Sequence, residues 1–219
     1  MDYTLNFGAV FRGFDDLLAG LLLGLEMGLG GLLVGSLIGI LAALAAVYGG
    51  RPARILVSLY VGLIRNVPIL VLALFAFFAL PSIGIRFDNV ITFAAVLAVY
   101  AGAYLTESFR AAIQVIPKGI TEAAQSIGLT RTGTAIWVIL PIALRNALPS
   151  VGNNFISLFK DTSIAAVIAV PELTFQARKI NNESFRVIEV WMIASLMYVF
   201  TCALIATGLR RLEAAFPKF

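Results

Sequence analysis

Residues 117–141, PKGITEAAQSIGLTRTGTAIWVILP, separate long apolar runs with a segment that is charged and amphipathic. Thr121 can cap the start of a first helix. Gly128 can close that helix in the left-handed conformation, which glycine adopts without steric cost. A second short helix is expected over about 132–140, and it should stop near Pro141. The segment therefore predicts two short helices joined by a glycine turn between membrane spans, an arrangement typical of a docking element.

The composition is that of an integral membrane protein. Charged residues make up only 13% of the 219 residues and hydrophobic residues 60%, whereas soluble domains are ~25% charged. The chain has no histidine, which excludes histidine metal sites, histidine general bases and Ser-His-Asp triads. The single cysteine, Cys202, excludes an internal disulfide. No metal site is expected.

Five apolar runs are long enough to cross a bilayer, which requires ~20 helical residues. They comprise residues 17–48, 55–80, 90–116, 147–170 and 187–208. Glycines recur at four-residue spacing in the first run, which favours close packing within the subunit over a separate dimer face. The sequence predicts an all-α membrane protein, a single domain over 1–219 with five transmembrane helices. Residues 117–141 and 171–186 are its longer loops.

The second run contains an interruption, Arg65-Asn66-Val67-Pro68. Neither half of the run could cross a bilayer alone, so the halves are expected to form one span together. An arginine and a proline at such depth must be buried in protein or line a water-filled cavity. Snorkelling of Arg65 to an interface is the alternative, and the long apolar stretches on both sides argue against it.

The charges flanking the spans predict the orientation. One side carries nine basic and two acidic residues, a net +7, and the other five basic and seven acidic residues, a net −2. The basic residues of the first side are Arg51, Arg54, Arg110, Lys118, Arg131, Arg145, Arg210, Arg211 and Lys218. Because basic flanks face the cytoplasm, the amino terminus is expected outside, and the loop 117–141 and the carboxy terminus inside.

Ionisable groups within spans are candidate functional residues, since charge in hydrocarbon is unfavourable. They are Glu26, Arg65, Glu107, Lys160 and Asp161. Glu107 and Arg110 could pair on one helix face, which Tyr104 shares. Lys160 and Asp161 point about 100° apart on a helix and need separate partners. These groups are either structural ion pairs or a site for a zwitterionic ligand. The carboxylate of such a ligand would bind Arg65 or Lys160, and its ammonium would bind Glu107 or Asp161.

The central segment resembles the EAA loop of binding-protein-dependent ABC importer permeases. The likeness rests on Glu122-Ala123-Ala124, Gly128 and Leu140-Pro141, with Val138 where the consensus has isoleucine. It implies a cytoplasmic coupling helix that sits in a cleft on a separate ATPase subunit. The residues that the resemblance assigns to coupling are Glu122, Ala123, Ala124, Gly128, Leu129 and Arg131. The alternative is an interfacial amphipathic helix without a coupling role.

Three further motifs are similar to those of polar amino-acid importer permeases. Residues 65–70 resemble R-G-T-P-L-L, with Asn66 and Val67 replacing glycine and threonine. Residues 103–119 resemble A-Y-x-x-E-x-x-R followed by I-P-K-G, and residues 160–163 resemble K-D-T-S. The likeness implies a substrate site at Tyr104, Glu107 and Asp161, supported by Arg65 and Lys160. The implied substrates are polar amino acids, with a lean toward glutamate, aspartate or their amides.

The same resemblance implies a half-transporter in the bacterial inner membrane. Its partners would be an identical or homologous permease subunit, two cytoplasmic ATPase subunits and an extracytoplasmic solute-binding protein; nucleic acid is not among them. The chain contains no G-x-x-x-x-G-K-[ST], so ATP and Mg²⁺ would be bound by the ATPase, with no catalytic residue and no cofactor in this chain. The alternatives are a secondary ion-coupled carrier, which usually shows inverted repeats, and a membrane enzyme, for which HExxH and GxSxG motifs are lacking.

Overall fold

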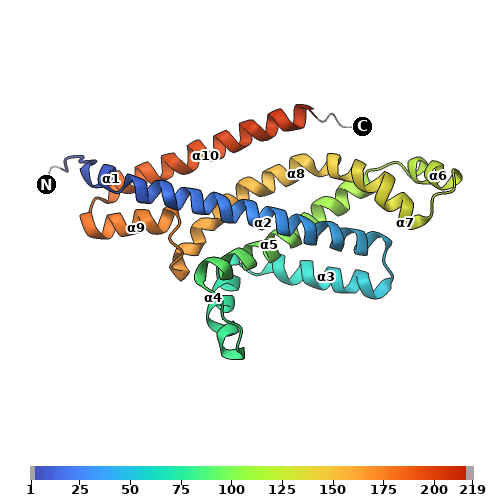
Figure 1. Ribbon diagram of the computed structural model, residues 1–219, viewed down its shortest axis with the longest axis horizontal. Helices are drawn as coiled ribbons and strands as arrows, with labels where there is room; N and C mark the ends of the chain where they lie inside the picture. The colour runs from blue at the N-terminus through green and yellow to red at the C-terminus, as the bar shows by residue number, and fades with distance from the viewer. Residues whose placement is uncertain (1–2, 216–219) are drawn as a thin grey trace.

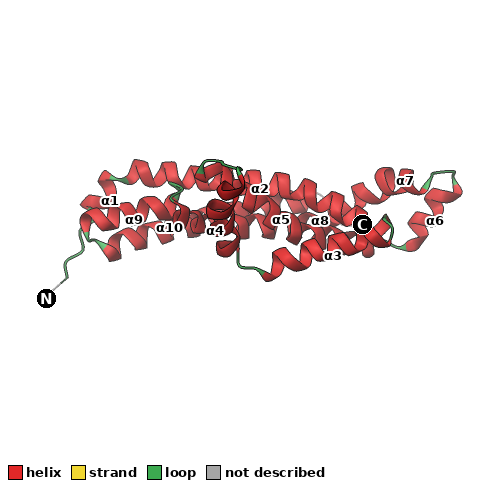
Figure 2. Cartoon of the chain, turned by 90° about the horizontal axis from the view of Figure 1, so that it is seen from below, coloured by secondary structure: helices red, strands yellow, loops and turns green. Residues whose placement is uncertain are grey.

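The computed structural model describes residues 3–215, and this range is helical without a strand (Figure 2). In chain order the elements are α1 (Gly8–Arg12), α2 (Phe14–Tyr48), α3 (Arg51–Asn66), α4 (Ile69–Ala79), the 3₁₀ turn η1 (Leu80–Ile83), α5 (Asn89–Gln114), α6 (Lys118–Ser126), α7 (Arg131–Thr134), the π-helical η2 (Ala135–Ile139), α8 (Leu140–Asp161), the 3₁₀ segment η3 (Thr162–Ile168), α9 (Leu173–Ser184) and α10 (Val187–Ala215).

The long helices lie along one axis, with α1 and α9 at one end and α6 and α7 at the other (Figure 1). Four helical segments are long and apolar enough to cross a membrane, and the bent pair α3 and α4 raises the number to as many as five. The predicted all-α membrane fold is therefore confirmed. Its orientation in the cell stays a prediction, and two residues of the charge count, Asp2 and Lys218, lie outside the described range.

The glycines of α2 bring that helix against its neighbours within the subunit. Gly20 packs on the backbone of Glu172 and Leu173, while Gly35 and Gly39 pack on α5. A Cβ added at Gly35 would lie 2.6 Å from the Cβ of Ala101. Contacts this short leave no room for a side chain, so the prediction that the glycine stripe serves packing within the subunit is confirmed.

This packing predicts that Gly35→Ala destabilises the protein, although alanine favours helices. Overpacking against α5 should cost about 1–3 kcal/mol, which outweighs the ~0.5–1 kcal/mol gained from helix propensity. Gly30 is the matched control, since a Cβ there meets nothing within 4 Å. Melting temperatures of the detergent-purified variants should fall for Gly35→Ala and stay level or rise for Gly30→Ala. Equal melting temperatures would contradict the packing account.

The second apolar run does not form one continuous helix. The helix α3 begins at Arg51, with Pro52 in its first turn, and ends at Asn66. The chain then bends by 100° into α4. Pro68 disfavours a helical conformation for the preceding residue, and Val67 is accordingly extended, with φ −108° and ψ 130°. Figure 1 shows α4 projecting sideways from the bundle. The run expected to form one span over 55–80 therefore consists of two helices that meet at a sharp bend, and together these pass the length and hydropathy test for one broken span.

Two expectations for the central segment are wrong. The first helix, α6, begins at Lys118 after Pro117, so Thr121 lies inside it and is not its cap. The second helix does not stop at Pro141, because α7, η2 and α8 form one continuous helical segment, and the fourth span begins well before residue 147. Proline lacks an N–H and clashes with the carbonyl four residues earlier. The wider π-helical turn at Ala135–Ile139 immediately precedes Pro141 and accommodates it.

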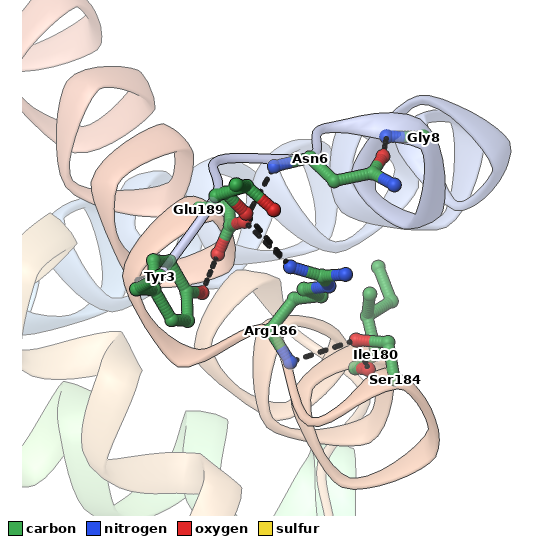
Figure 3. Close-up of polar contacts among 8 residues, drawn as sticks. Tyr3, Asn6, Gly8, Ile180, Ser184, Arg186 and Glu189 are labelled. Atoms are coloured by element: carbon green, nitrogen blue, oxygen red, sulfur yellow. Dashed lines mark hydrogen bonds and ion pairs between the residues drawn. The ribbon is translucent and has the colours of Figure 1, made fainter. Parts of the chain in front are cut away.

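The amino-terminal segment is tied to the start of α10 by a buried carboxylate (Figure 3). Glu189 is fully buried and accepts hydrogen bonds from the Tyr3 hydroxyl and from the Asn6 backbone N–H, at 2.7 Å for the latter. The Arg186 guanidinium lies 3.6 Å from the same carboxylate and also donates to the Thr4 carbonyl. A buried charge is stable only when paired and hydrogen-bonded in this way, so the network positions residues 3–6 on the bundle.

A second buried carboxylate, that of Glu172, caps the start of α9. This helix lies within the region expected to be a loop. The Glu172 oxygens accept from the backbone N–H groups of Thr174 and Phe175, each at 2.8 Å, and from the Tyr198 hydroxyl at 3.0 Å. This is the N-cap geometry that satisfies free donors at a helix start. Burial raises the pKa of Glu172 to about 7, although these hydrogen bonds act in the opposite direction.

The raised pKa predicts how stability depends on pH. A carboxyl whose pKa rises from 4.5 to about 7 on folding favours the folded state most below pH 4.5, and this contribution is lost as the pH rises through 7. The melting temperature should therefore decline across that window. Glu172→Gln should flatten the decline while keeping an acceptor for the cap. Glu183→Gln, an exposed change in the same helix, should keep the wild-type profile; parallel profiles for all three proteins would refute the assignment.

Candidate functional site

The candidate site is built around α5. Gly102 and Thr106 are buried toward α2 and α3, whereas Tyr100, Tyr104 and Glu107 line cavities on other sides of the helix. The two tyrosine rings lie 4.9 Å apart, and the Tyr100 hydroxyl donates to that of Tyr104 at 3.2 Å. The spacing of four residues stacks these side chains one turn apart. Tyr104 is thereby held in place by its helical neighbour.

Neighbouring helices are tied to α5 by hydrogen bonds on both sides. The Tyr60 hydroxyl of α3 donates to the Val99 carbonyl at 2.6 Å. On the side of α8, the hydroxyls of Ser108 and Ser150 lie 2.7 Å apart. Such links between helices fix the relative positions of the side chains that face the cavities.

The tyrosine cavity lies between α5 and α8 and has a volume of about 220 Å³. The α8 side of this cavity carries Asn154, Ser157 and Asp161, whose spacing places them on one helix face. The α5 side carries Tyr100 and Tyr104. Asp161 is the only charged residue in its lining. A half-buried carboxylate beside two aromatic rings and an amide suits a cationic or ammonium group.

The arginine cavity lies between α2, α3 and α5 and has a volume of about 670 Å³. Its charged lining consists of Arg54, Arg65, Glu107 and Arg110. The predicted pair on α5 is confirmed, because the Arg110 Nε donates to one Glu107 oxygen at 3.2 Å and its Nη2 donates to the other. Arg110 also donates to Gln114 at 3.3 Å.

Tyr104 and Arg65 bring the linings of the two cavities into contact. Tyr104 lines the tyrosine cavity, and the Arg65 guanidinium lies 5.0 Å from the centre of its ring, within cation–π range. Arg65 is in the last turn of α3, where the partial negative charge of the helix end favours a cation. The neighbouring Asn66 donates to the Gly62 carbonyl at 2.7 Å. The residue that departs from the family motif therefore satisfies a carbonyl at the end of α3.

The structure brings four of the five predicted substrate residues to these adjoining cavities: Tyr104, Glu107, Asp161 and Arg65. Lys160 is exposed and lines neither cavity. Adjacent residues of a helix point about 100° apart, so Lys160 lies on a different face from Asp161. Sequence reasoning missed Tyr100, Asn154, Ser157, Arg54 and Gln114. The helical spacings from Tyr104 and Asp161 could have identified the first three, because residues four or seven apart share a face.

The predicted coupling segment forms a turn between two short helices at the end of the molecule opposite α1 (Figure 2). Gly128 has a φ of +93°, as predicted. The Leu129 N–H donates to the Ala124 carbonyl at 3.2 Å, which closes α6, and the Thr130 hydroxyl caps α7 through Gly133 at 3.1 Å. Beside the turn, the apolar side chain of Ile127 is 82% exposed.

The other predicted coupling residues differ in exposure. Glu122, Ala123 and Arg131 are exposed, whereas Ala124 is buried and Leu129 partly so. The segment thus presents a mixed polar and apolar surface on a turn of defined geometry, which is suited to docking against another protein.

In residues 3–215, no group of three potential metal-ligating His, Cys, Asp or Glu side chains is present.

Polar cavities within an apolar helical bundle, together with a paired-helix element projecting from one end, are typical of a subunit of a membrane transporter. Residues 35–216 match the model of the family described as binding-protein-dependent transport system inner membrane component, and the chain belongs to that family. The resemblance to ABC importer permeases is thereby confirmed.

The chain is similar to permease proteins of known systems. It is 38% identical over 174 residues to the glutamine transport system permease protein GlnP of Escherichia coli strain K12, covering 78% of this chain and 80% of that protein. It is 40% identical over 161 residues to the probable glutamine ABC transporter permease protein GlnP of Bacillus subtilis strain 168, covering 72% and 74%. The crystal structure of an amino acid ABC transporter with histidines matches with a TM-score of 0.89 and 30% identity, covering 97% of this chain and all of that one.

Proposed function

We propose that this chain is the permease subunit of an ATP-driven, binding-protein-dependent importer whose substrate is a polar amino acid of the glutamine type. The observation that carries the proposal is the tyrosine cavity, where Asp161 faces two tyrosines and the amide of Asn154. The substrate ammonium would pair with Asp161, and the side-chain amide would exchange hydrogen bonds with Asn154 and Ser157.

The charge of the tyrosine cavity favours an amide over an acid. Asp161 is its only charged lining residue, so the side-chain carboxylate of glutamate or aspartate would enter beside a negative charge, and the lining itself contains no cation to compensate it. A neutral amide avoids this penalty. The names of the two similar permeases, both of glutamine systems, agree with this choice. The lean toward acidic amino acids or their amides is thereby narrowed to the amides.

The proposal includes an assembly in the inner membrane of a bacterium. A second permease subunit completes the path, a solute-binding protein delivers substrate at the α1 and α9 end, and two ATPase subunits dock on α6 and α7. ATP and Mg²⁺ are bound by the ATPase subunits. The basic flanks on the α6 side support this orientation, and family membership argues against a secondary carrier.

Removing the charge of Asp161 should weaken substrate stimulation of the transporter. A charge-assisted hydrogen bond contributes about 1.5–3 kcal/mol. Asp161→Asn should therefore raise the glutamine concentration that gives half-maximal stimulation by ~10–100-fold. The measurement is ATP hydrolysis by the complex reconstituted with its ATPase and binding protein, with glutamine, glutamate and lysine compared. Asn153→Ala, an exposed change on the same helix outside the cavity, is the control. Unaltered stimulation in Asp161→Asn would contradict the site.

The turn at Gly128 should be needed for binding the ATPase subunit. Gly128→Val meets no neighbouring atom, but it places a β-branched residue at φ +93° and should distort the turn, because positive φ is a genuine outlier for such residues. The recovered ATPase should fall at least several-fold when the permease is purified by affinity. Gly119→Val makes the same change within α6, where a Cβ is also unobstructed, and should retain the ATPase. Full recovery with Gly128→Val would count against the coupling role.

A further inference from the structure

The arginine cavity is formed by two facing polar stripes. On α3 the stripe consists of Arg54, Ser58, Gly62 and Arg65, and on α5 of Glu107, Arg110 and Gln114. Spacings of three and four residues put each stripe on one helix face. The remaining surface of α3 is apolar, with Ile55, Leu56, Leu59 and Leu63 exposed. A membrane helix with one charged face turns that face toward protein or water, so the cavity is a polar groove that faces away from lipid.

The charges in this groove do not cancel. Both oxygens of Glu107 are engaged by Arg110, whose remaining nitrogen binds Gln114. Over residues 3–215, the ion pairs are those of Arg110, Lys179 and Arg186, so neither Arg54 nor Arg65 pairs with a carboxylate there. Two guanidinium groups are left facing a space of about 670 Å³. Guanidinium groups bind carboxylates and phosphates through paired hydrogen bonds.

The groove adjoins the proposed substrate cavity. The linings of the two spaces touch where Arg65 lies against the ring of Tyr104, so a solute that passes from one space to the other passes this contact. A free amino acid carries its carboxylate with it, and Arg65 is the first cation of the groove that it meets. Arg54, about three turns away along α3, is the next cation of that helix face.

We infer that the groove is a second amino-acid binding site, in which Arg54 holds the carboxylate after the solute has passed Tyr104 and Arg65. The inference rests on the proposed function, because the solute must come from the tyrosine cavity. It assigns a role to Arg54, Gln114 and Gly62 that no family motif in the sequence covers. The phosphate of an anionic lipid headgroup has the same oxyanion chemistry and is the competing occupant that the test must separate.

The test is the number of glutamine molecules bound per permease chain, measured with radiolabelled glutamine on the permease–ATPase complex without its solute-binding protein, in phosphatidylcholine nanodiscs. Two molecules are expected for the wild type. Arg54→Gln should abolish the weaker site and leave one. Arg51→Gln, an exposed change on α3 outside the groove, should leave two. Asp161→Asn should lose the other site and keep the one in the groove.

The outcomes separate the two hypotheses. One glutamine per chain in the wild type, lost in Asp161→Asn and unaffected by Arg54→Gln, would overturn the second site and leave the proposed function intact. Two sites that are both unaffected by Asp161→Asn would overturn the proposed function. Repeating the measurement with phosphatidylglycerol distinguishes the occupants: retention of the weaker site supports an amino-acid site. The inference would be overturned if lipid completely replaced glutamine at the weaker site and co-purified with the wild type but not with Arg54→Gln.

A second variant tests the groove without removing charge. A Cβ at Gly62 meets no atom within 4 Å, so Gly62→Leu should fold and fill part of the space. Glutamine uptake into proteoliposomes should turn over at least tenfold more slowly, with KM changed less than twofold, because the tyrosine cavity is untouched. Gly62→Ala should transport at a rate near that of the wild type. An unchanged turnover for Gly62→Leu would contradict passage through the groove.

Discussion

The close approach of α2 and α5 is the constraint on which the rest of the structure depends. It is possible because Gly31, Gly35 and Gly39 present no side chains to α5. Lipid tails are as apolar as leucine, so helices in a bilayer associate through tight packing and polar contacts more than through the hydrophobic effect. With one face of α5 pressed on α2, its other faces turn toward α3 and α8. The positions of both polar cavities follow from this arrangement.

Polar groups within the bundle divide into those that stabilise the fold and those that remain available to a ligand. Glu189 and Glu172 belong to the first group, since their carboxylates are surrounded by donors. Asp161, Arg65 and Arg54 belong to the second, because they line cavities and make no ion pair with another described residue. Retaining unpaired charge inside a membrane protein is unfavourable, and under the proposed function a solute that carries the opposite charges would supply the compensation.

The break between α3 and α4 connects local chain chemistry to this function. Pro68 ends α3, which places Arg65 in the last helical turn beside Tyr104. A straight helix through residues 55–80 would carry its following residues along the bundle instead of sideways. The polar stripe of α3 therefore stops where the tyrosine cavity begins. The boundary between the two cavities is set by a proline whose main effect is on the residue that precedes it.

Much of the fold could be predicted from local sequence because its causes are local. Apolar length determines that the runs cross a membrane, a glycine determines the left-handed turn at residue 128, and a three-residue spacing pairs Glu107 with Arg110. The 100° bend, the π-helical turn before Pro141 and the helix α9 could not be predicted in this way. Each depends on how neighbouring segments accommodate a proline or cap a helix end.

The sequence by itself determined the membrane class, the family and most of the charged residues of the candidate site. Only the tertiary structure decided which of those charges share a space. Asp161 and Lys160 are adjacent in the chain, yet the former lines a cavity and the latter does not. Arg65 and Tyr104 are far apart in the chain and lie in contact. The physical reason is that a helix turns consecutive side chains to different sides, and packing between helices then selects which sides meet.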